Sequence, residues 1–222
     1  MSSDPKIQSR RQRQAAETRR EILETAQRLF LERGYAGTSI RDIAAEADVA
    51  VQTIYSSIGS KSALAAALSD HLDESAGVGA VLSRVRASGD PVEVIDLAVS
   101  IPRAFVEGET GSIVRAVESA AAVEPEMAAV LAEGARRHRD GATRIVSLLD
   151  ERFGLREGVS LEHASVAFAT MTMPAVWREL TEDQGWSFDD AHAWIAGRLA
   201  AELLEPEAAG AGKGTKRDRG GN

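Results

Sequence analysis

The sequence predicts an all-α fold, and three observations support this prediction. The 222-residue chain has no stretch of alternating apolar and polar residues long enough for a sheet. Alanine is abundant, and apolar residues recur at intervals of three and four, which places them on one helix face. The composition, 44% hydrophobic and 27% charged, is that of a soluble globular protein.

The absence of cysteine excludes disulfides, catalytic thiols and cysteine-ligated metals, and it fits a reducing cytoplasm. No apolar run is long enough for a membrane span.

The net charge of −8 is distributed unevenly along the chain. Residues 1–61 carry ten Lys or Arg and eight Asp or Glu, whereas the remaining residues carry sixteen and twenty-six. Within the first twenty residues, six basic side chains accompany only two acidic ones. Such a segment cannot bury apolar surface, so we expect residues 1–14 to form a disordered basic arm. The arm is either a solvated terminus or a segment that meets phosphates or a minor groove.

Four helices are expected in the first third of the chain, over residues 15–33, 40–47, 50–57 and 60–74. Gly34 supplies the left-handed residue that ends the first helix. Ser39 and Asp42 have the spacing of a capping box at the start of the second helix. Ser60 is the predicted N-cap of the fourth helix.

The second and third helices have the pattern of a helix-turn-helix. Such a motif needs a small residue where its helices approach, a tight turn, and apolar residues that hold the pair together. Ala44 is the small contact residue, and Val49 and Ile54 are the apolar ones. Asp48 occupies the turn, at a position that favours a positive φ. The spacing alone also fits a generic αα-corner.

Further helices are expected over residues 91–107, 110–122, 125–152, 160–181 and 188–204. The glycines between residues 77 and 89, followed by a proline, predict a loosely structured junction after the fourth helix. Pro102 and Pro174 fall inside predicted helices and should kink them. Residues 207–222 are glycine-rich and predict a disordered tail. These elements divide into an N-terminal domain, residues 15–61, and a second helical domain, residues 62–206.

The run from Arg20 to Leu64 resembles the N-terminal domain of the TetR family of bacterial transcription regulators. It reads REILETAQRLFLERGYAGTSIRDIAAEADVAVQTIYSSIGSKSAL. The matching pieces are Ile22-Leu23, Ala26, Leu29-Phe30, Gly34-Tyr35, Thr38-Ser39, Ile43-Ala44, Val49, Thr53-Ile54-Tyr55 and Ser60-Lys61. The resemblance covers about a quarter of the chain. It implies a homodimer in which each recognition helix, residues 50–57, enters a major groove of DNA. It also implies that the C-terminal domain binds a ligand and dimerises.

The resemblance also implies which residues meet DNA. The outward residues of the recognition helix are candidates for base edges, namely Val51, Gln52 and Ser56. Tyr55 and Lys61 match the tyrosine and lysine of the family that contact phosphate. Further phosphate donors are Thr38, Ser39 and Thr53. Without the resemblance, Tyr55 would be read as a packed aromatic and Lys61 as an ordinary surface charge. The chain departs from the family at Ala50, where Ser is frequent, and at Ser57, where His or Tyr is frequent.

A dimer interface is predicted near the end of the chain. Residues 160–181 are apolar almost all round, so a helix there must be covered on more than one side. The family dimerises through its last two long helices as a four-helix bundle. The predicted interface comprises Leu161, Phe168, Val176, Ala191, Ile195, Leu199 and Leu203. The alternative is that these residues form an entirely intramolecular core.

A small-molecule site is predicted between the kinked helices. The candidate lining residues are Phe105, Arg115, Met127, Leu131, His138, Phe168, Met171 and Trp177. Each has an alternative as ordinary core or surface. Kinks at the two prolines would open the cavity, since each proline removes a backbone hydrogen bond.

No catalytic or metal-binding set stands out. The four histidines do not form a His-x-x-x-His or His-Glu-x-x-His pattern, and no phosphate-binding loop or nucleophile elbow is present. We therefore expect no enzymatic activity, no cofactor and no metal. The sequence predicts a regulator that binds a double-stranded DNA operator as a homodimer and responds to a small-molecule effector. We expect a repressor that releases a palindromic operator on binding the effector. The alternative is an all-α enzyme or scaffold that keeps the helix-turn-helix as an interaction module.

Overall fold

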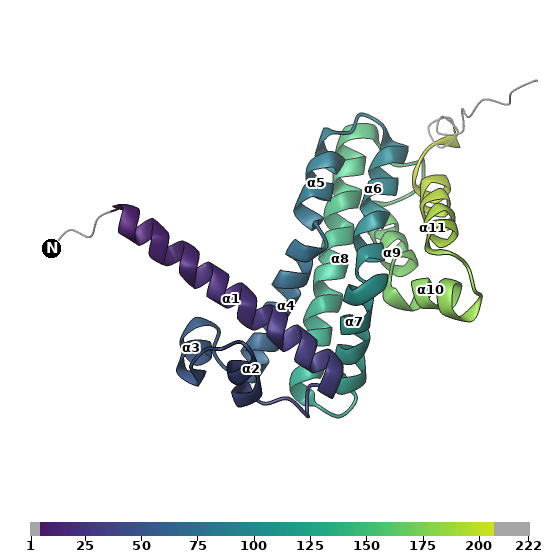
Figure 1. The fold of residues 1–222 in the computed structure, drawn as a ribbon. Coiled ribbons are helices and arrows are strands. Elements are labelled where there is room, and N and C mark those ends of the chain that lie inside the picture. The colour runs from purple at the N-terminus through teal and green to yellow at the C-terminus, as the bar shows by residue number, and fades with distance from the viewer. Residues whose placement is uncertain (1–4, 207–222) are drawn as a thin grey trace, which may run out of the picture. The chain divides into compact units, whose positions relative to one another are not determined.

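The all-α fold class is confirmed by a computed structural model, which describes residues 5–206. Among these residues the chain forms α-helices and one π-helix but no strand (Figure 1). The predicted tail, residues 207–222, and residues 1–4 of the predicted arm lie outside the described residues. No described helix has both the length and the apolar character that a membrane crossing requires.

The chain divides into two compact units. The N-terminal unit contains α1 to α4 together with residues 105–136, and the C-terminal unit contains residues 79–104 together with those from Arg137 onward. The division into units is therefore discontinuous in sequence and differs from the domain boundary predicted near residue 61. The functional boundary at that position stays a prediction.

The N-terminal unit is built on α1 (Pro5–Arg33), which begins ten residues before the predicted start. Residues 5–14 are thus helical rather than an irregular arm. The segment is rich in Arg and Gln, which are good helix formers, and Pro5 stands at the first helical position, where proline is tolerated. Residues 11–17 are exposed, so this part of α1 contributes no core.

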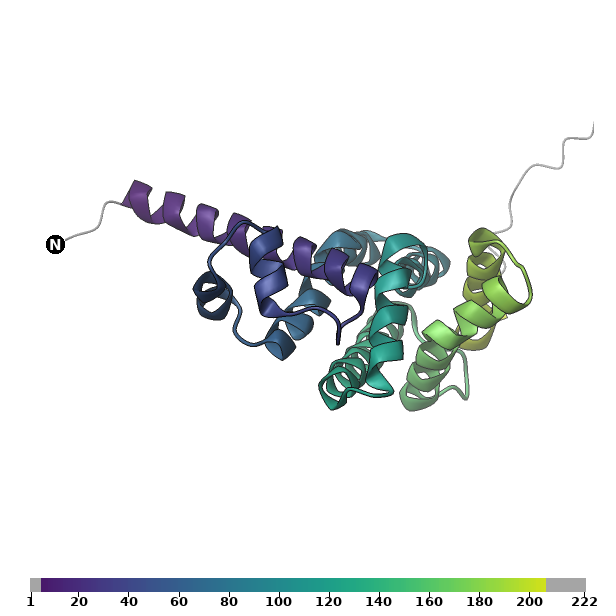
Figure 2. The same ribbon diagram turned by 60° about the horizontal axis from the view of Figure 1, so that its bottom comes forward.

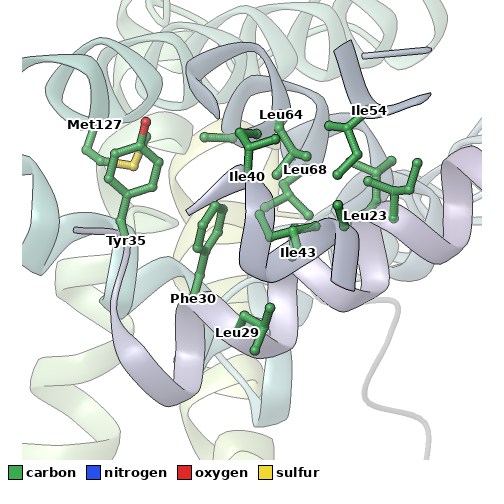
Figure 3. Packing of buried hydrophobic residues seen from close by; sticks show 14 residues of the cluster. Leu23, Leu29, Phe30, Tyr35, Ile40, Ile43, Ile54, Leu64, Leu68 and Met127 are labelled. Atoms are coloured by element: carbon green, nitrogen blue, oxygen red, sulfur yellow. The ribbon is translucent and has the colours of Figure 1, made fainter. Parts of the chain in front are cut away.

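Two short helices, α2 (Ile40–Glu46) and α3 (Val51–Ser57), pack against α1 and against each other. Figures 1 and 2 both show them lying beside α1. α4 (Lys61–Ser75) follows and also packs on α1. The buried side chains that hold these helices together form one cluster, in which Ile22, Leu29, Ile43, Ile54 and Leu64 are fully buried (Figure 3).

The unit is completed by α7 (Gly108–Ala121) and the first turns of α8 (Pro125–Phe153). α7 packs on α1, and Met127 of α8 is buried within the same cluster as the helix-turn-helix core. Figure 3 shows Met127 beside Tyr35, although ninety-two residues separate them in sequence. α8 continues beyond residue 136 and supplies its remaining turns to the C-terminal unit.

The C-terminal unit begins with α5 (Val78–Ala87), where the sequence predicted a loose junction. The helix forms because Gly77, at φ 66°, ends the preceding helix, and Val85 then finds a buried position. α6 (Pro91–Ala104) contains Pro102 within the helix, as predicted.

The predicted single helix over residues 160–181 is in fact three elements. α9 (Leu161–Met171) ends before Pro174, α10 (Pro174–Arg178) begins on that proline, and the π-helix η1 (Glu179–Asp183) follows. Proline lacks the N–H that a continuing helix would need, but it fits a first helical position. α11 (Phe188–Leu203) closes the unit by packing on α6 and α9.

Candidate nucleic-acid interface and regulatory unit

The turn between α2 and α3 has the geometry that a helix-turn-helix requires. Asp48 adopts a φ of 52°, and the N–H of Val49 donates to the carbonyl of Ala44 at 3.0 Å. Ala44 is buried, which allows the two helices to approach. Among the described residues Asp48 is the only one other than glycine with positive φ, so the strain is confined to this turn. The predicted motif is confirmed at each of these positions.

The recognition helix α3 has one inward and one outward face. Ile54 is fully buried, and Val51 packs against the same cluster because residues three apart share a helix face. Gln52 and Ser56 are exposed, and Tyr55 exposes 51% of its surface. Val51, which was predicted to point outward, is partly buried against the core and partly exposed. The exposed groups of α3 are an amide, a phenol and the hydroxyls of Ser56 and Ser57.

Not all of the predicted phosphate donors are accessible. Thr38 is only 1% exposed, and its hydroxyl donates to the carbonyls of Leu29 and Gly34, at 3.1 and 2.9 Å. Its side chain therefore holds the turn after α1 and is not available to a phosphate, which corrects the prediction. Ser39 is exposed at the N-cap of α2, and Thr53 is partly exposed on α3.

Ser39 and Asp42 form the predicted capping box. The Asp42 N–H donates to the Ser39 hydroxyl at 3.1 Å, and the Ser39 N–H donates to the Asp42 carboxylate at 2.8 Å. The Ser39 hydroxyl also donates to that carboxylate, and these bonds lower the pKa of Asp42 from its ordinary value. The box fixes the start of α2 and thereby the position of the following turn.

Replacing Ser39 by alanine is expected to lower the free energy of unfolding by about 1 kcal/mol, because the N-cap is lost. Urea denaturation of the two proteins measures the difference. Since the pKa of Asp42 is lowered in the folded state, the contribution of the box is present above the unfolded pKa and is lost as the pH falls. The difference should shrink in acid. Ser56→Ala is the control, because this exposed hydroxyl donates only within its own helix.

A contact that the sequence did not predict holds the C-terminal end of α3. The Arg19 guanidinium on α1 donates to the Ser57 carbonyl at 2.8 Å. A cation at this end of a helix complements the helix dipole and satisfies a terminal carbonyl. The chain has Ser57 where the family frequently has His or Tyr, so it lacks an aromatic or imidazole donor to the backbone at this position. That departure is the sequence signal that another side chain must donate there.

Lys61, at the start of α4, does not extend freely into solvent. Its Nζ lies over the Tyr35 ring, 3.9 Å from the ring centroid. The Tyr35 hydroxyl donates to the Glu126 carboxylate at 2.8 Å. Burial lowers the pKa of Lys61, while the charges of Glu124 and Glu126 partly offset that shift. Burial and the bond to Glu126 raise the pKa of Tyr35.

The predicted dimer residues of α11 are buried within the protomer. They are Ala191, Ile195, Leu199 and Leu203, and each has no exposed surface. Because α11 packs on α6 and α9, these side chains form the core of the C-terminal unit. Phe168 of α9 is buried as well, whereas Leu161 and Val176 are exposed and partly exposed. The prediction that the α11 stripe faces a partner is therefore wrong.

The outward faces of α9 and α11 carry a different set of apolar residues. Val166 of α9 exposes 61% of its surface, and Trp194 of α11 exposes 37%. Along the exposed face of α11 a small residue recurs at every fourth position, at Ala193, Gly197 and Ala201. A Cβ added at Gly197 would meet no atom within 4 Å, so packing inside the protomer does not require a glycine there.

The predicted ligand-lining residues are divided between the two units. Phe105, Arg115, Met127 and Leu131 belong to the N-terminal unit, and His138, Phe168, Met171 and Trp177 belong to the C-terminal unit. The side chain of Met127 is part of the helix-turn-helix core, which corrects its assignment to a ligand cavity. The side chains of Phe168 and Trp177 are buried in the core of their own unit. The His138 ring lies 2.9 Å from the Ala169 carbonyl.

Across the described residues, no group of three or more His, Asp or Glu side chains is arranged to hold a metal ion. His163 and His192 each face a single carboxylate, those of Glu202 and Asp96, both at 3.0 Å.

Known proteins resemble the chain both in sequence and in fold. The sequence profile described as "Bacterial regulatory proteins, tetR family" matches residues 22–68. The HTH-type transcriptional repressor Rv3405c of Mycobacterium tuberculosis is 38% identical over 92 residues, which are 39% of this chain and 46% of the relative. The matched stretch thus spans less than half of that relative.

Among solved structures, a TetR-family regulator from Syntrophomonas wolfei has a TM-score of 0.68 and 16% identity, covering 90% of this chain and 99% of the other. AibR, solved with isovaleryl coenzyme A and operator DNA, has a TM-score of 0.56 and 25% identity, covering 82% and 97%. The profile match lies on the helices that build the helix-turn-helix, and the fold matches extend over most of the chain. The segment 22–68 is thus similar in sequence to the tetR family of bacterial regulatory proteins, and the fold of the chain is similar to that of TetR-family regulators.

Proposed function

We propose that this protein is a cytoplasmic transcriptional repressor that binds operator DNA as a homodimer and releases it when a small molecule binds. In this proposal α3 enters the major groove, where Gln52 and Ser56 meet base edges. Tyr55, Thr53, Ser39 and Lys61 contact phosphates, which position the protein on the duplex.

The observation that carries this proposal is the two-faced recognition helix. Ile54 anchors α3 in the core, while Gln52, Tyr55 and Ser56 stand exposed on its outer side. An exposed amide is the group that pairs bidentately with adenine, and phenol and hydroxyl groups donate to phosphate oxygens. The capping box of α2 and Arg19 at the end of α3 hold this helix in place.

Two of the related proteins support the regulatory part of the proposal. Rv3405c is named a repressor, and the AibR structure contains an acyl-coenzyme A together with operator DNA. In this proposal the dimer has one arrangement that binds the operator and one that does not. An effector that binds the second arrangement more tightly lowers operator affinity by the difference between its binding free energies for the two arrangements. The C-terminal unit is the proposed site of the effector.

We further infer that the second copy packs on the outer faces of α9 and α11. Val166 and Trp194 offer exposed apolar surface, and the small residues of α11 permit close approach of another helix. A glycine inside a helix costs about 0.5–1 kcal/mol relative to alanine, and nothing within the protomer requires Gly197. Close contact with a partner helix accounts for the glycine.

The test is selection of bound sequences from a random duplex library, followed by fluorescence anisotropy at several salt concentrations. Gln52→Ala is expected to relax the preference at one base pair per half-site, at a cost of about 1–3 kcal/mol. Lys61→Ala should weaken binding to all sequences alike and reduce the salt slope by about one per protomer.

Arg86→Ala is the control for charge, because this exposed arginine belongs to the C-terminal unit. It should leave the selected sequence and the salt slope unchanged. A wild-type protein that enriches no sequence from the library would contradict the proposed function.

A further inference from the structure

The first turn of α8 is built into the helix-turn-helix at two adjacent residues. Met127 is buried in the helix-turn-helix core, and Glu126 accepts the hydrogen bond from the Tyr35 hydroxyl at 2.8 Å. Tyr35 itself is almost entirely buried and packs against Phe30, with ring centroids 5.2 Å apart. The Tyr35 ring is thus fixed on one side by the core and at its hydroxyl by α8.

Lys61 covers one face of this fixed ring. The Nζ atom stands 3.9 Å from the ring centroid, well within the range of a cation–π attraction. A lysine side chain that moves freely in solution loses rotamer entropy when it makes one fixed contact. The ring restricts Lys61 beforehand, so less entropy remains to be lost when the ammonium meets a phosphate.

We propose that Glu126 is a positioning residue for DNA binding, acting through Tyr35 to order Lys61 at the start of α4. This inference rests on the proposed function, in which Lys61 contacts a phosphate. α8 continues from Glu126 to Phe153 and supplies residues to the C-terminal unit. A displacement of α8 would therefore act on Lys61 through two side chains, without any change in the recognition helix itself.

The first experiment is a set of double-mutant cycles on the affinity for the selected operator. Tyr35→Phe and Glu126→Ala are each expected to weaken binding about three- to ten-fold, the loss of one hydrogen bond. Glu126→Gln keeps an acceptor for the tyrosine hydroxyl and should retain most of the affinity. In the Lys61→Ala background neither Tyr35→Phe nor Glu126→Ala should have a further effect, because the group that they position is gone.

Glu133→Ala is the matched control on the same helix. Glu133 pairs with Arg136 at 2.7 Å on the exposed side of α8, and its removal changes the protein charge as Glu126→Ala does. Operator affinity should remain that of the wild type. A purely structural role for Tyr35 or Glu126 would weaken binding equally with and without Lys61, and that additive result overturns the proposal.

The second experiment needs no DNA. The chain contains four lysines, so the ε-methylene signals can be assigned by substitution. In the wild type the Lys61 signal should be shifted upfield by the Tyr35 ring current. It should move toward the free-lysine position in Tyr35→Phe and Glu126→Ala but not in Glu126→Gln or Glu133→Ala. An unchanged signal in all four variants overturns the positioning role. A wild type that selects no operator would instead refute the proposed function, and the NMR result would still decide whether Glu126 orders Lys61.

Discussion

Replacing Gly197 by arginine is expected to convert the proposed dimer into monomers and to lower operator affinity by about 100-fold or more. The substitution places a long charged side chain on the outer face of α11, where we infer that the partner helix lies closest. In the dimer the two protomers bind the two half-sites of the operator together. Separate monomers bind each half-site independently, so the affinity gained from simultaneous binding is lost. Sedimentation and anisotropy on the same samples measure both effects.

The same substitution should not harm the folded protomer. A Cβ at Gly197 meets nothing within 4 Å, and arginine favours a helix more than glycine does. Gly134→Arg on α8 is the matched control, because a Cβ at that exposed helical glycine also meets nothing within 4 Å. A dimeric Gly197→Arg protein with wild-type operator affinity would place the interface elsewhere.

Trp177→Ala is expected to destabilise the protein by about 3–5 kcal/mol, since it empties a large buried volume. Trp177 has no exposed surface, and its ring stacks near Phe188 with centroids 6.3 Å apart. A loss of this size is a large share of the stability of an ordinary domain. Urea unfolding followed by circular dichroism measures it, through the shift of the midpoint at constant slope.

Trp186→Ala provides the comparison within the same unit. Trp186 exposes 39% of its surface and makes an edge-to-face contact with Trp194, with centroids 6.0 Å apart. Loss of one such aromatic pair costs about 0.5–1.5 kcal/mol beyond the buried area. Equal losses in Trp177→Ala and Trp186→Ala would mean that α10 is not packed as the structure has it.

Features set by neighbouring residues could be predicted from the sequence. The capping box needs only Ser39 and Asp42 at the right spacing, and the turn at Asp48 follows from two flanking helices that must meet. The break before Pro174 was foreseen as a kink. In the structure the helix is interrupted completely, because a new helix, α10, begins at that proline.

Features set by distant residues could not be predicted. Periodicity shows that Ile195 and Leu199 are buried, but it does not show whether a partner or the same chain covers them. The contacts of Tyr35 with Glu126 and of Arg19 with Ser57 join residues 91 and 38 positions apart. Exposure on α3 could be assigned for Gln52 and Ser56, but Val51 lies at the margin of the apolar stripe and is partly buried.

The burial of Met127 within the helix-turn-helix core limits how this protein could be recombined with others. A chimera joined after α4 would keep the whole matched segment, residues 22–68, yet would leave a methionine-sized gap in its hydrophobic centre. A grafted recognition module must therefore carry residues 105–136 as well, or fill the gap with a larger side chain on α1 or α4. The unit that contains the helix-turn-helix is compact in space, but it is encoded by two separate segments of the chain and cannot be exchanged as one continuous segment.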